Sequence, residues 1–96
     1  MSYKDRYHPG IKADLKKLDK QVIKDIFRLH IDKILQEPDR GDRLHGDLEG
    51  LFSYHFRKRS VDYRIAYTIE EGKKLVFFLR IGKRESFYEV LRRRLS

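Results

Sequence analysis

The residues whose types and spacing suggest chemistry lie between Leu51 and Tyr67, a stretch that predicts two adjacent strands. Side chains on a strand point alternately to opposite faces, so aromatic residues share one face of the first strand and polar or basic residues share the other. The first set is Phe52, Tyr54 and Phe56, and the second is Ser53, His55, Arg57 and Arg59. Neighbouring like charges repel by a few tenths of a kcal/mol to ~1 kcal/mol per pair, a cost with no benefit for a strand that only packs. The pattern therefore predicts an anionic ligand on the basic face.

Arg64 extends this basic face onto the second strand. It alternates with Tyr63 and Ile65, whose side chains we expect on the apolar face, so Arg64 should emerge beside His55 across the hairpin. Solvated charge on an open antiparallel sheet face has the same appearance, which leaves a purely structural role open for His55 and Arg57.

The composition restricts the class of ligand. Lys and Arg number 23 against 15 Asp and Glu, a formal net charge of +8. A small domain this basic is commonly a nucleic-acid or ribosome binder, although a protein with an acidic protein partner has a similar balance. The chain has no cysteine, which excludes disulfides, thiolate metal sites and a cysteine nucleophile. His8 and His30 lack partners at metal-ligand spacing and His45 lies in a glycine-rich loop, so we predict no metal and no cofactor.

Length and hydropathy predict one domain, a soluble protein and a cytoplasmic location. The 96 residues are enough for a single core of helices on a sheet. No apolar run approaches the ~20 residues of a membrane span, and the N-terminus lacks the apolar core of a signal peptide.

The first forty residues predict a short strand and two helices. Weak aromatic alternation over Tyr3–Tyr7 predicts an edge strand, and Pro9-Gly10 then opens a helix of about two turns. Asp19 is placed to cap a longer helix, which Glu37-Pro38 ends because the residue before proline is pushed out of the α region. The apolar stripe of this helix is Val22, Ile23, Ile26, Phe27, Ile31, Ile34 and Leu35. The two helices should form an antiparallel hairpin.

The rest of the chain predicts a loop, a three-strand meander and a closing helix. The loop spans 39–50, and strands follow at 51–58, 62–69 and 74–81, with Glu71-Gly72 in the second turn. The third strand is apolar on both faces and should be the most buried, with Gly82 ending it. A short basic helix is expected from Glu85 to Leu95. The predicted fold class is α+β, a twisted antiparallel sheet of an N-terminal edge strand and the meander, packed on the helical hairpin.

Three short motifs, in this order, resemble the RelE/ParE toxin superfamily over nearly the whole chain. They are Leu44-x-Gly46-x-Leu48-x-Gly50-Leu51-Phe52, Asp62-Tyr63-Arg64-Ile65-Ala66-Tyr67, and Ile81-Gly82-Lys83-Arg84-Glu85 with Tyr88. The resemblance implies a toxin of a type II toxin–antitoxin system, with a single RelE-like domain over residues 1–96. It also implies a cognate RelB-like antitoxin as partner, with operator DNA bound only through the antitoxin and no membrane partner.

RelE-like members of this superfamily cleave messenger RNA on the ribosome without a metal and so inhibit translation. The ribose 2′-hydroxyl attacks the adjacent phosphate, which requires a proton acceptor, cations for the developing charge and a group that assists the leaving 5′-oxygen. The resemblance implies that the catalytic residues of this endoribonuclease are His55, Arg57, Arg64, Arg84 and Tyr88. Further RNA-binding residues are predicted at Arg59, Lys58, Lys83, Arg92 and Arg93.

The sequence departs from the RelE-like pattern where lysines usually stand, at His55 and Arg57. An imidazole accepts a proton at neutral pH, whereas a lysine first needs a lowered pKa, so His55 is the predicted base. An arginine cannot act as a base, so Arg57 is predicted to hold phosphate. Tyr88 lies closer to Arg84 than in the family pattern, and either stacks on a base of the codon or anchors the last helix. If His55 has only a structural role, the candidate bases are Lys58, Lys83 and Tyr88.

Two other functions remain open at the level of sequence. ParE-like members of the superfamily poison DNA gyrase and need no catalytic residues on this face. A catalytically inactive homologue would act only as a co-repressor with its antitoxin on operator DNA.

Overall fold

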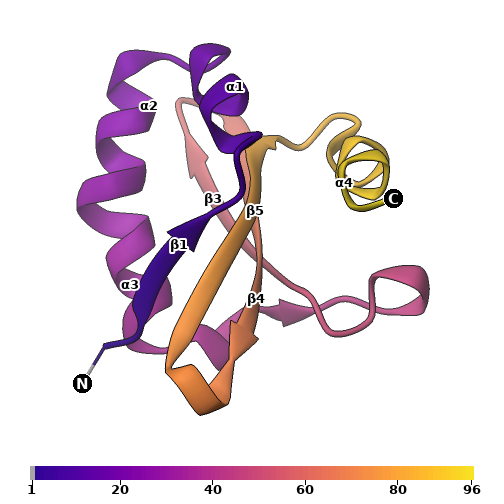
Figure 1. Ribbon diagram of the computed structural model, residues 1–96. Helices are drawn as coiled ribbons and strands as arrows, with labels where there is room; N and C mark the ends of the chain where they lie inside the picture. The colour runs from indigo at the N-terminus through magenta and orange to yellow at the C-terminus, as the bar shows by residue number, and fades with distance from the viewer. Residues whose placement is uncertain (1) are drawn as a thin grey trace.

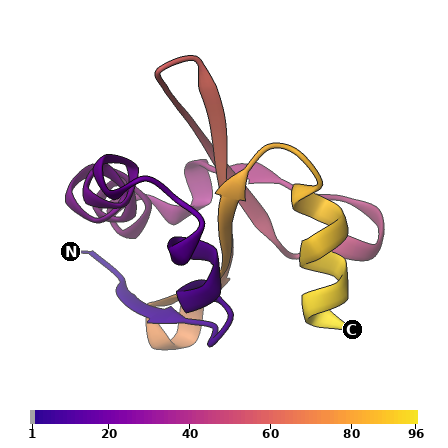
Figure 2. The ribbon, with the colours of Figure 1, turned by 90° about the horizontal axis from the view of Figure 1, so that it is seen from above.

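A computed structural model of the protein describes residues 2–96 and shows one sheet with helices on both faces (Figures 1 and 2). The strands are β1 (Lys4–Tyr7), β2 (Asp42–Arg43), β3 (Phe52–Lys58), β4 (Val61–Glu70) and β5 (Leu75–Lys83). Their order in the sheet is β1-β5-β4-β3-β2. The α+β class and the three-strand meander are confirmed. The sheet is mixed rather than wholly antiparallel, because β1 runs parallel to β5.

The N-terminal helices cover one face of the sheet, and the C-terminal helix covers the other (Figure 2). The first helix, α1 (Ile11–Lys16), packs on β5. A long helix then runs through three consecutive segments, which are α2 (Lys20–Asp25), a π-helical turn (Ile26–His30) and α3 (Ile31–Gln36). The last helix is α4 (Phe87–Leu95). No helix among residues 2–96 has the length and hydrophobicity that crossing a membrane requires.

The long helix begins and ends where the sequence predicts. The Asp19 carboxylate accepts a hydrogen bond from the backbone N–H of Gln21 at 3.3 Å, which confirms the N-cap. The helix stops at Gln36, before Pro38. The chain between Pro38 and β3 consists of two 3₁₀ turns (Pro38–Arg40 and Gly46–Leu48) with β2 between them.

The π-helical turn changes which side chains of the long helix are buried. The backbone N–H of Ile31 donates to the carbonyl of Ile26, five residues earlier. A turn of this width places residues i and i+5 on one face, so Ile26 and Ile31 both face the sheet and are 0% and 4% exposed. Phe27 is 43% exposed, and its expected place in the buried stripe is wrong.

The main core lies between the N-terminal helices and the sheet, and a smaller cluster lies under α4. The smaller cluster consists of Leu48, Ala66, Leu79, Phe87 and Leu91. The prediction that β5 is the most buried strand is confirmed, since five of its nine residues are buried, against four of ten in β4.

Two local expectations are wrong. Gly82 does not end the last strand but pairs with Arg64 inside it. A Cβ at Gly82 would lie 3.2 Å from Nη2 of Arg80, so the glycine leaves room for that guanidinium. Within the predicted loop, Asp42 and Arg43 pair with Ser53 and Phe52 as an additional strand. Two residues are too short a segment for alternation to be visible in the sequence.

Candidate active site

Pairing of β3 with β4 brings the predicted site residues to one face of the sheet. His55 lies directly opposite Arg64, and Arg57 lies opposite Asp62. The aromatic residues of β3 point the other way, toward the N-terminal helices, where Phe52 belongs to the main core and Tyr54 and Phe56 pack against it. The predicted separation of a basic and an apolar face is therefore confirmed.

Ser53 connects β3 to α4 at the base of this face. Its side chain is buried, with the residue 1% exposed. Oη of Tyr88 donates to Oγ of Ser53 at 3.2 Å, and Nε2 of His55 lies 3.1 Å from the same Oγ. A carboxylate oxygen of Asp42 on β2 lies 3.8 Å from Nε2 of His55. The side chain of His55 is nevertheless 45% exposed, so the imidazole is accessible from solvent.

Arg64 lies over the ring of Tyr88. Its guanidinium carbon is 5.2 Å from the ring centroid, within the range of a cation–π contact. The contact joins β4 to α4 and orients the guanidinium on the basic face. Tyr88 therefore both anchors the last helix and lies among the predicted site residues.

Asp62 lies between the two remaining predicted arginines. Its carboxylate oxygens are 3.8 Å from Nε of Arg57 and 3.8 Å from Nη1 of Arg84. The backbone N–H of Arg84 also donates to the Asp62 carbonyl at 3.0 Å, which holds the end of β5 beside β4. A pocket of about 330 Å³ results, lined by His55, Phe56, Arg57, Asp62, Tyr63, Arg64 and Arg84. Three arginines against one aspartate leave the pocket positively charged.

None of the five predicted RNA-binding residues lines this pocket. Lys58 lies on the helical side, in an ion pair with Asp25 that lowers the pKa of the aspartate. Arg59 occupies the β3–β4 turn, 3.9 Å from an oxygen of Asp19. Lys83 pairs with Tyr63 at the end of β5 and lines a neighbouring pocket.

The other two predicted RNA-binding residues lie on α4. Arg92 donates to Asp47 at 2.9 Å, and Arg93 is exposed. Their roles, like those of the pocket residues, stay predictions.

Arg94 holds α4, and with it Tyr88, against the sheet. Nη1 and Nη2 of Arg94 donate to the two carboxylate oxygens of Asp14 on α1 at 2.8 and 2.9 Å. Nη1 also donates to the carbonyl of Leu79 at 2.9 Å. The backbone N–H of Ile81 donates to Asp14 at 3.0 Å. The last arginine of the basic run at the C-terminus is thus a half-buried structural contact.

Sequence reasoning missed three residues of the site: Ser53, Asp62 and Asp42. Alternation placed Ser53 on the basic face with His55, but the flanking sequence did not indicate that α4 would cover it. Asp62 begins the motif Asp62–Tyr67, and its position opposite Arg57 follows once the β3–β4 turn is known. Asp42 depends on the short strand β2, for which the sequence has no pattern.

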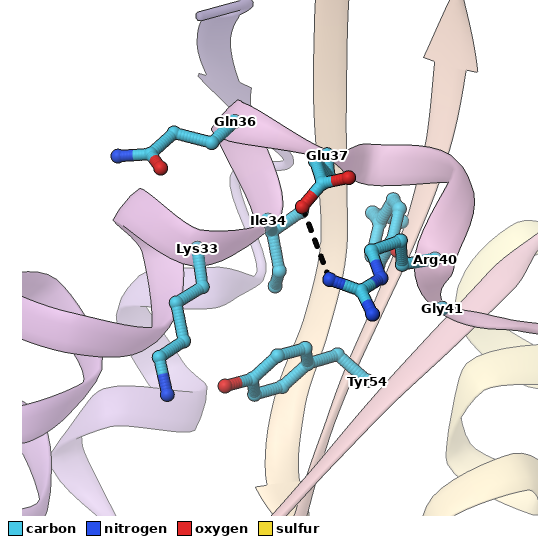
Figure 3. A pocket seen from close by; sticks show the side chains of 8 residues that line it. Lys33, Ile34, Gln36, Glu37, Arg40, Gly41 and Tyr54 are labelled. Carbon is cyan, nitrogen blue, oxygen red and sulfur yellow. Dashed lines mark hydrogen bonds and ion pairs between the residues drawn. The ribbon is translucent and has the colours of Figure 1, made fainter.

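A second pocket, of about 410 Å³, lies on the helical side of the sheet between α3 and β3 (Figure 3). It is lined by Lys33, Glu37, Arg40 and Tyr54, and Glu37 and Arg40 form an ion pair of 3.1 Å across its rim. Since Tyr54 points away from the face of His55, this pocket is separate from the candidate site. Within residues 2–96, no three His, Asp or Glu side chains gather closely enough to hold a metal ion.

Comparison with known proteins identifies the family. A family model described as the ParE-like toxin of type II bacterial toxin–antitoxin systems matches residues 7–92. The curated Toxin RelE of Mycobacterium tuberculosis is 33% identical over 95 residues, which cover 94% of each chain.

Solved structures show the same fold. One chain of the toxin–antitoxin complex RelBE2 from Mycobacterium tuberculosis has a TM-score of 0.74 at 28% identity, over 88% of this chain and 93% of that chain. A mutant of the E. coli toxin RelE in the free state has a TM-score of 0.76 at 21% identity, over 100% of both chains. The protein described here therefore belongs to the ParE-like toxins of type II bacterial toxin–antitoxin systems, within the RelE/ParE superfamily that its motifs resemble.

Proposed function

We propose that the protein is a ribosome-dependent, metal-independent endoribonuclease that cleaves messenger RNA and so stops translation. The observation that carries this proposal is the convergence of His55, Arg64 and Tyr88 on one open face, beside a pocket with two further arginines. A toxin that only blocks a partner by binding has no need for an imidazole, a phenol and several guanidiniums around one point.

These residues supply each group that attack by a ribose 2′-hydroxyl requires. His55 accepts the proton of the 2′-hydroxyl, since its imidazole is accessible from solvent. Of its two ring nitrogens, Nε2 has a hydrogen-bond partner among residues 2–96 and Nδ1 has none there. Arg57 and Arg84 hold the scissile phosphate from the side of Asp62, and Arg64 stabilises the charge that develops on the phosphorane. Tyr88 protonates the leaving 5′-oxygen.

Primer extension on ribosomes programmed with a defined messenger RNA tests the proposal. The parent protein should produce codon-phased cuts, and His55→Ala should lower the single-turnover rate by about two to four powers of ten. Lys73→Gln is the matched control, because Lys73 is exposed. It lies on the turn between β4 and β5, far from His55 on β3. Intact messenger RNA after incubation with the parent protein and ribosomes would contradict the proposal.

We also propose an antitoxin as the partner that silences the protein. The RelBE2 structure from Mycobacterium tuberculosis and the RelBE structure from E. coli are toxin–antitoxin complexes, and one chain of each has the present fold. An apolar groove of about 410 Å³ beside α1 is lined by Tyr7, Pro9, Ile11, Leu15 and Phe27, with Lys12 at its edge. An amphipathic helix with acidic flanks fits this surface. A purified complex that still cleaves ribosome-bound RNA at the full rate would refute the silencing role.

The second candidate function is inhibition of DNA gyrase, which the ParE-like description of the matching family model favours. Supercoiling by purified gyrase in the presence of the protein distinguishes the two candidates. DNA breaks with intact messenger RNA would favour gyrase, and codon-phased RNA cuts with normal supercoiling would favour the endoribonuclease.

A further inference from the structure

We propose that Ser53 relays a proton between His55 and Tyr88, so that the proton removed from the 2′-hydroxyl and the proton given to the 5′-oxygen move in one connected chain. The inference rests on the endoribonuclease proposed above. In this scheme Ser53 touches neither RNA nor water, and it acts only through its two neighbours.

The geometry around Ser53 is that of a bridge. Its Oγ lies 3.1 Å from Nε2 of His55 and 3.2 Å from Oη of Tyr88, both within hydrogen-bonding distance. A serine hydroxyl has one proton and two acceptor lone pairs, so it can donate to one neighbour while it accepts from the other. Because Ser53 is 1% exposed, water does not compete for these positions.

The proton count of the relay balances. At the start, His55 carries its proton on Nε2 and donates to Ser53, and Ser53 donates to Tyr88. Nδ1 of His55 accepts the proton of the 2′-hydroxyl as the bond between O2′ and phosphorus forms. The Nε2 proton moves to Ser53, the Ser53 proton moves to Tyr88, and Tyr88 gives its own proton to the 5′-oxygen as the bond between phosphorus and O5′ breaks.

The products are a 2′,3′-cyclic phosphate and a free 5′-hydroxyl. One proton enters the relay and one leaves it, so His55, Ser53 and Tyr88 stay neutral. At the end Tyr88 donates to Ser53, the reverse of the starting direction, and the 3.2 Å between the two hydroxyl oxygens accommodates either donor. Nδ1 of His55 then loses its proton to solvent, while Tyr88 takes up a proton from solvent and the protons of Tyr88 and Ser53 move back one step each to Ser53 and Nε2, which restores the starting state.

The charged groups around the relay support this direction of transfer. Asp42, from β2, lies 3.8 Å from Nε2 of His55 and favours a proton on that nitrogen. Arg64, from β4, lies over the ring of Tyr88 and stabilises negative charge that develops on the phenol during transfer. The remaining charges that line the pocket beside His55 are Arg57, Asp62 and Arg84.

Ser53→Ala is the direct test, since it removes one buried oxygen and leaves the shape of the side chain nearly unchanged. The single-turnover rate of cleavage should fall about tenfold to a hundredfold, with ribosome affinity unchanged. Thr68→Ala is the matched control, because it removes a strand hydroxyl whose one side-chain hydrogen bond among residues 2–96 is to the Gly50 carbonyl at 3.3 Å. A Ser53→Ala protein that folds and cleaves at the parent rate would overturn the relay.

A double-mutant cycle separates a relay from mere support of the fold. Tyr88→Phe removes the tyrosine hydroxyl of the relay and leaves the buried Ser53 in place. It therefore tests the relay even if the Ser53→Ala protein fails to fold. Tyr88→Phe should itself slow cleavage, and Ser53→Ala/Tyr88→Phe should be no slower than Tyr88→Phe alone, since both substitutions interrupt one chain. Additive losses, or a Tyr88→Phe protein with parent activity, would overturn the relay.

The imidazole tautomer provides a readout that is independent of RNA. In ¹⁵N-detected NMR, Ser53→Ala should change the ratio of Nδ1–H to Nε2–H forms of His55, and Thr68→Ala should not; an unchanged ratio would overturn the relay. Failure of the relay is distinct from failure of the proposed function. A parent protein that leaves ribosome-bound RNA intact overturns both, whereas parent cleavage with unaffected Ser53→Ala overturns the relay alone.

Discussion

At the scale of single residues, Arg64 has the most informative environment. It is half-buried, lies directly opposite His55 on the neighbouring strand and is held over the ring of Tyr88. A guanidinium that other side chains hold in place needs little reorganisation when charge develops on a bound phosphate. Its position on the basic face was predictable from alternation alone, whereas its contact with Tyr88 was not.

Arg64→Ala should therefore lower the single-turnover rate of cleavage about a hundredfold or more while ribosome affinity changes far less. The lost cation–π contact is worth about 0.5–1 kcal/mol, so Tm should fall by only a few degrees. Arg64→Lys should restore part of the rate, because a point charge cannot reproduce the bidentate guanidinium. A folded Arg64→Ala protein with parent cleavage would remove Arg64 from the catalytic machinery.

At the scale of elements, the π-helical turn sets the environment of His30. Nδ1 of His30 lies 2.7 Å from Oη of Tyr54, and the imidazole stacks on Phe56 with ring centroids 4.0 Å apart. Burial lowers the pKa of His30, with a further lowering by Lys33 that Asp25 partly offsets. In a continuous α-helix the residues after Ile26 would be rotated differently, and this contact with β3 would be lost.

The lowered pKa of His30 predicts a loss of stability in mild acid. At pH values between the lowered pKa of His30 in the folded protein and its pKa in the unfolded chain, the unfolded chain binds more protons than the folded protein. The free energy of unfolding therefore falls as pH falls through that window. The test is thermal melting at pH 7.5 and near pH 5.5, buffer values on either side of the ordinary histidine pKa of ~6.5. The difference in Tm between the two buffers should be smaller for His30→Gln than for the parent. His45→Gln, at an exposed position, is the control and should behave as the parent does. An equal pH dependence in all three proteins would exclude His30 as the source.

The contact between α1 and α4 is the second feature at this scale. The side chains of Arg94 and Asp14 are 14% and 7% exposed, and removal of one partner leaves the other charge buried and unpaired. Arg94→Ala should cost about 3–5 kcal/mol and lower Tm by more than about 10 °C. Arg93→Ala, at the exposed position next to it, should change stability by no more than about 0.5 kcal/mol. Equal melting of the two variants would mean that the ion pair does not anchor α4.

At the scale of the whole molecule, the net charge of +8 predicts how binding depends on salt. Each phosphate contact releases counterions, so affinity for ribosomes or RNA should fall about tenfold or more between about 50 and 200 mM salt. Arg57→Gln should reduce the magnitude of the slope of log affinity against log salt concentration by about 1, the value for one lost phosphate contact. Lys73→Gln should leave the slope unchanged. Affinity that does not depend on salt would show that the basic face does not meet phosphate.

Residue types along the chain are enough to predict the class of fold and the two faces of the meander. Alternation of aromatic and basic residues on β3 and β4 specifies which side packs on helices, because a shift of one residue would bury the charges. Asp19 and Pro38 determined the limits of the long helix through local hydrogen bonding and backbone geometry. These are interactions between residues close in the chain or one strand apart, and they are visible in residue types alone.

The assembly of the site depends on contacts between elements that are distant in the chain. Ser53 and Tyr88 are 35 residues apart, and their contact depends on the path of α4 over the sheet, which the Arg94–Asp14 ion pair holds in place. Asp42 reaches His55 only through β2, and Lys58 is drawn to Asp25 on the other side of the sheet. Such contacts depend on the packing of whole elements, which has no local period in the sequence. The residue types on the basic face were therefore readable from the chain, and the hydrogen bonds that join them were not.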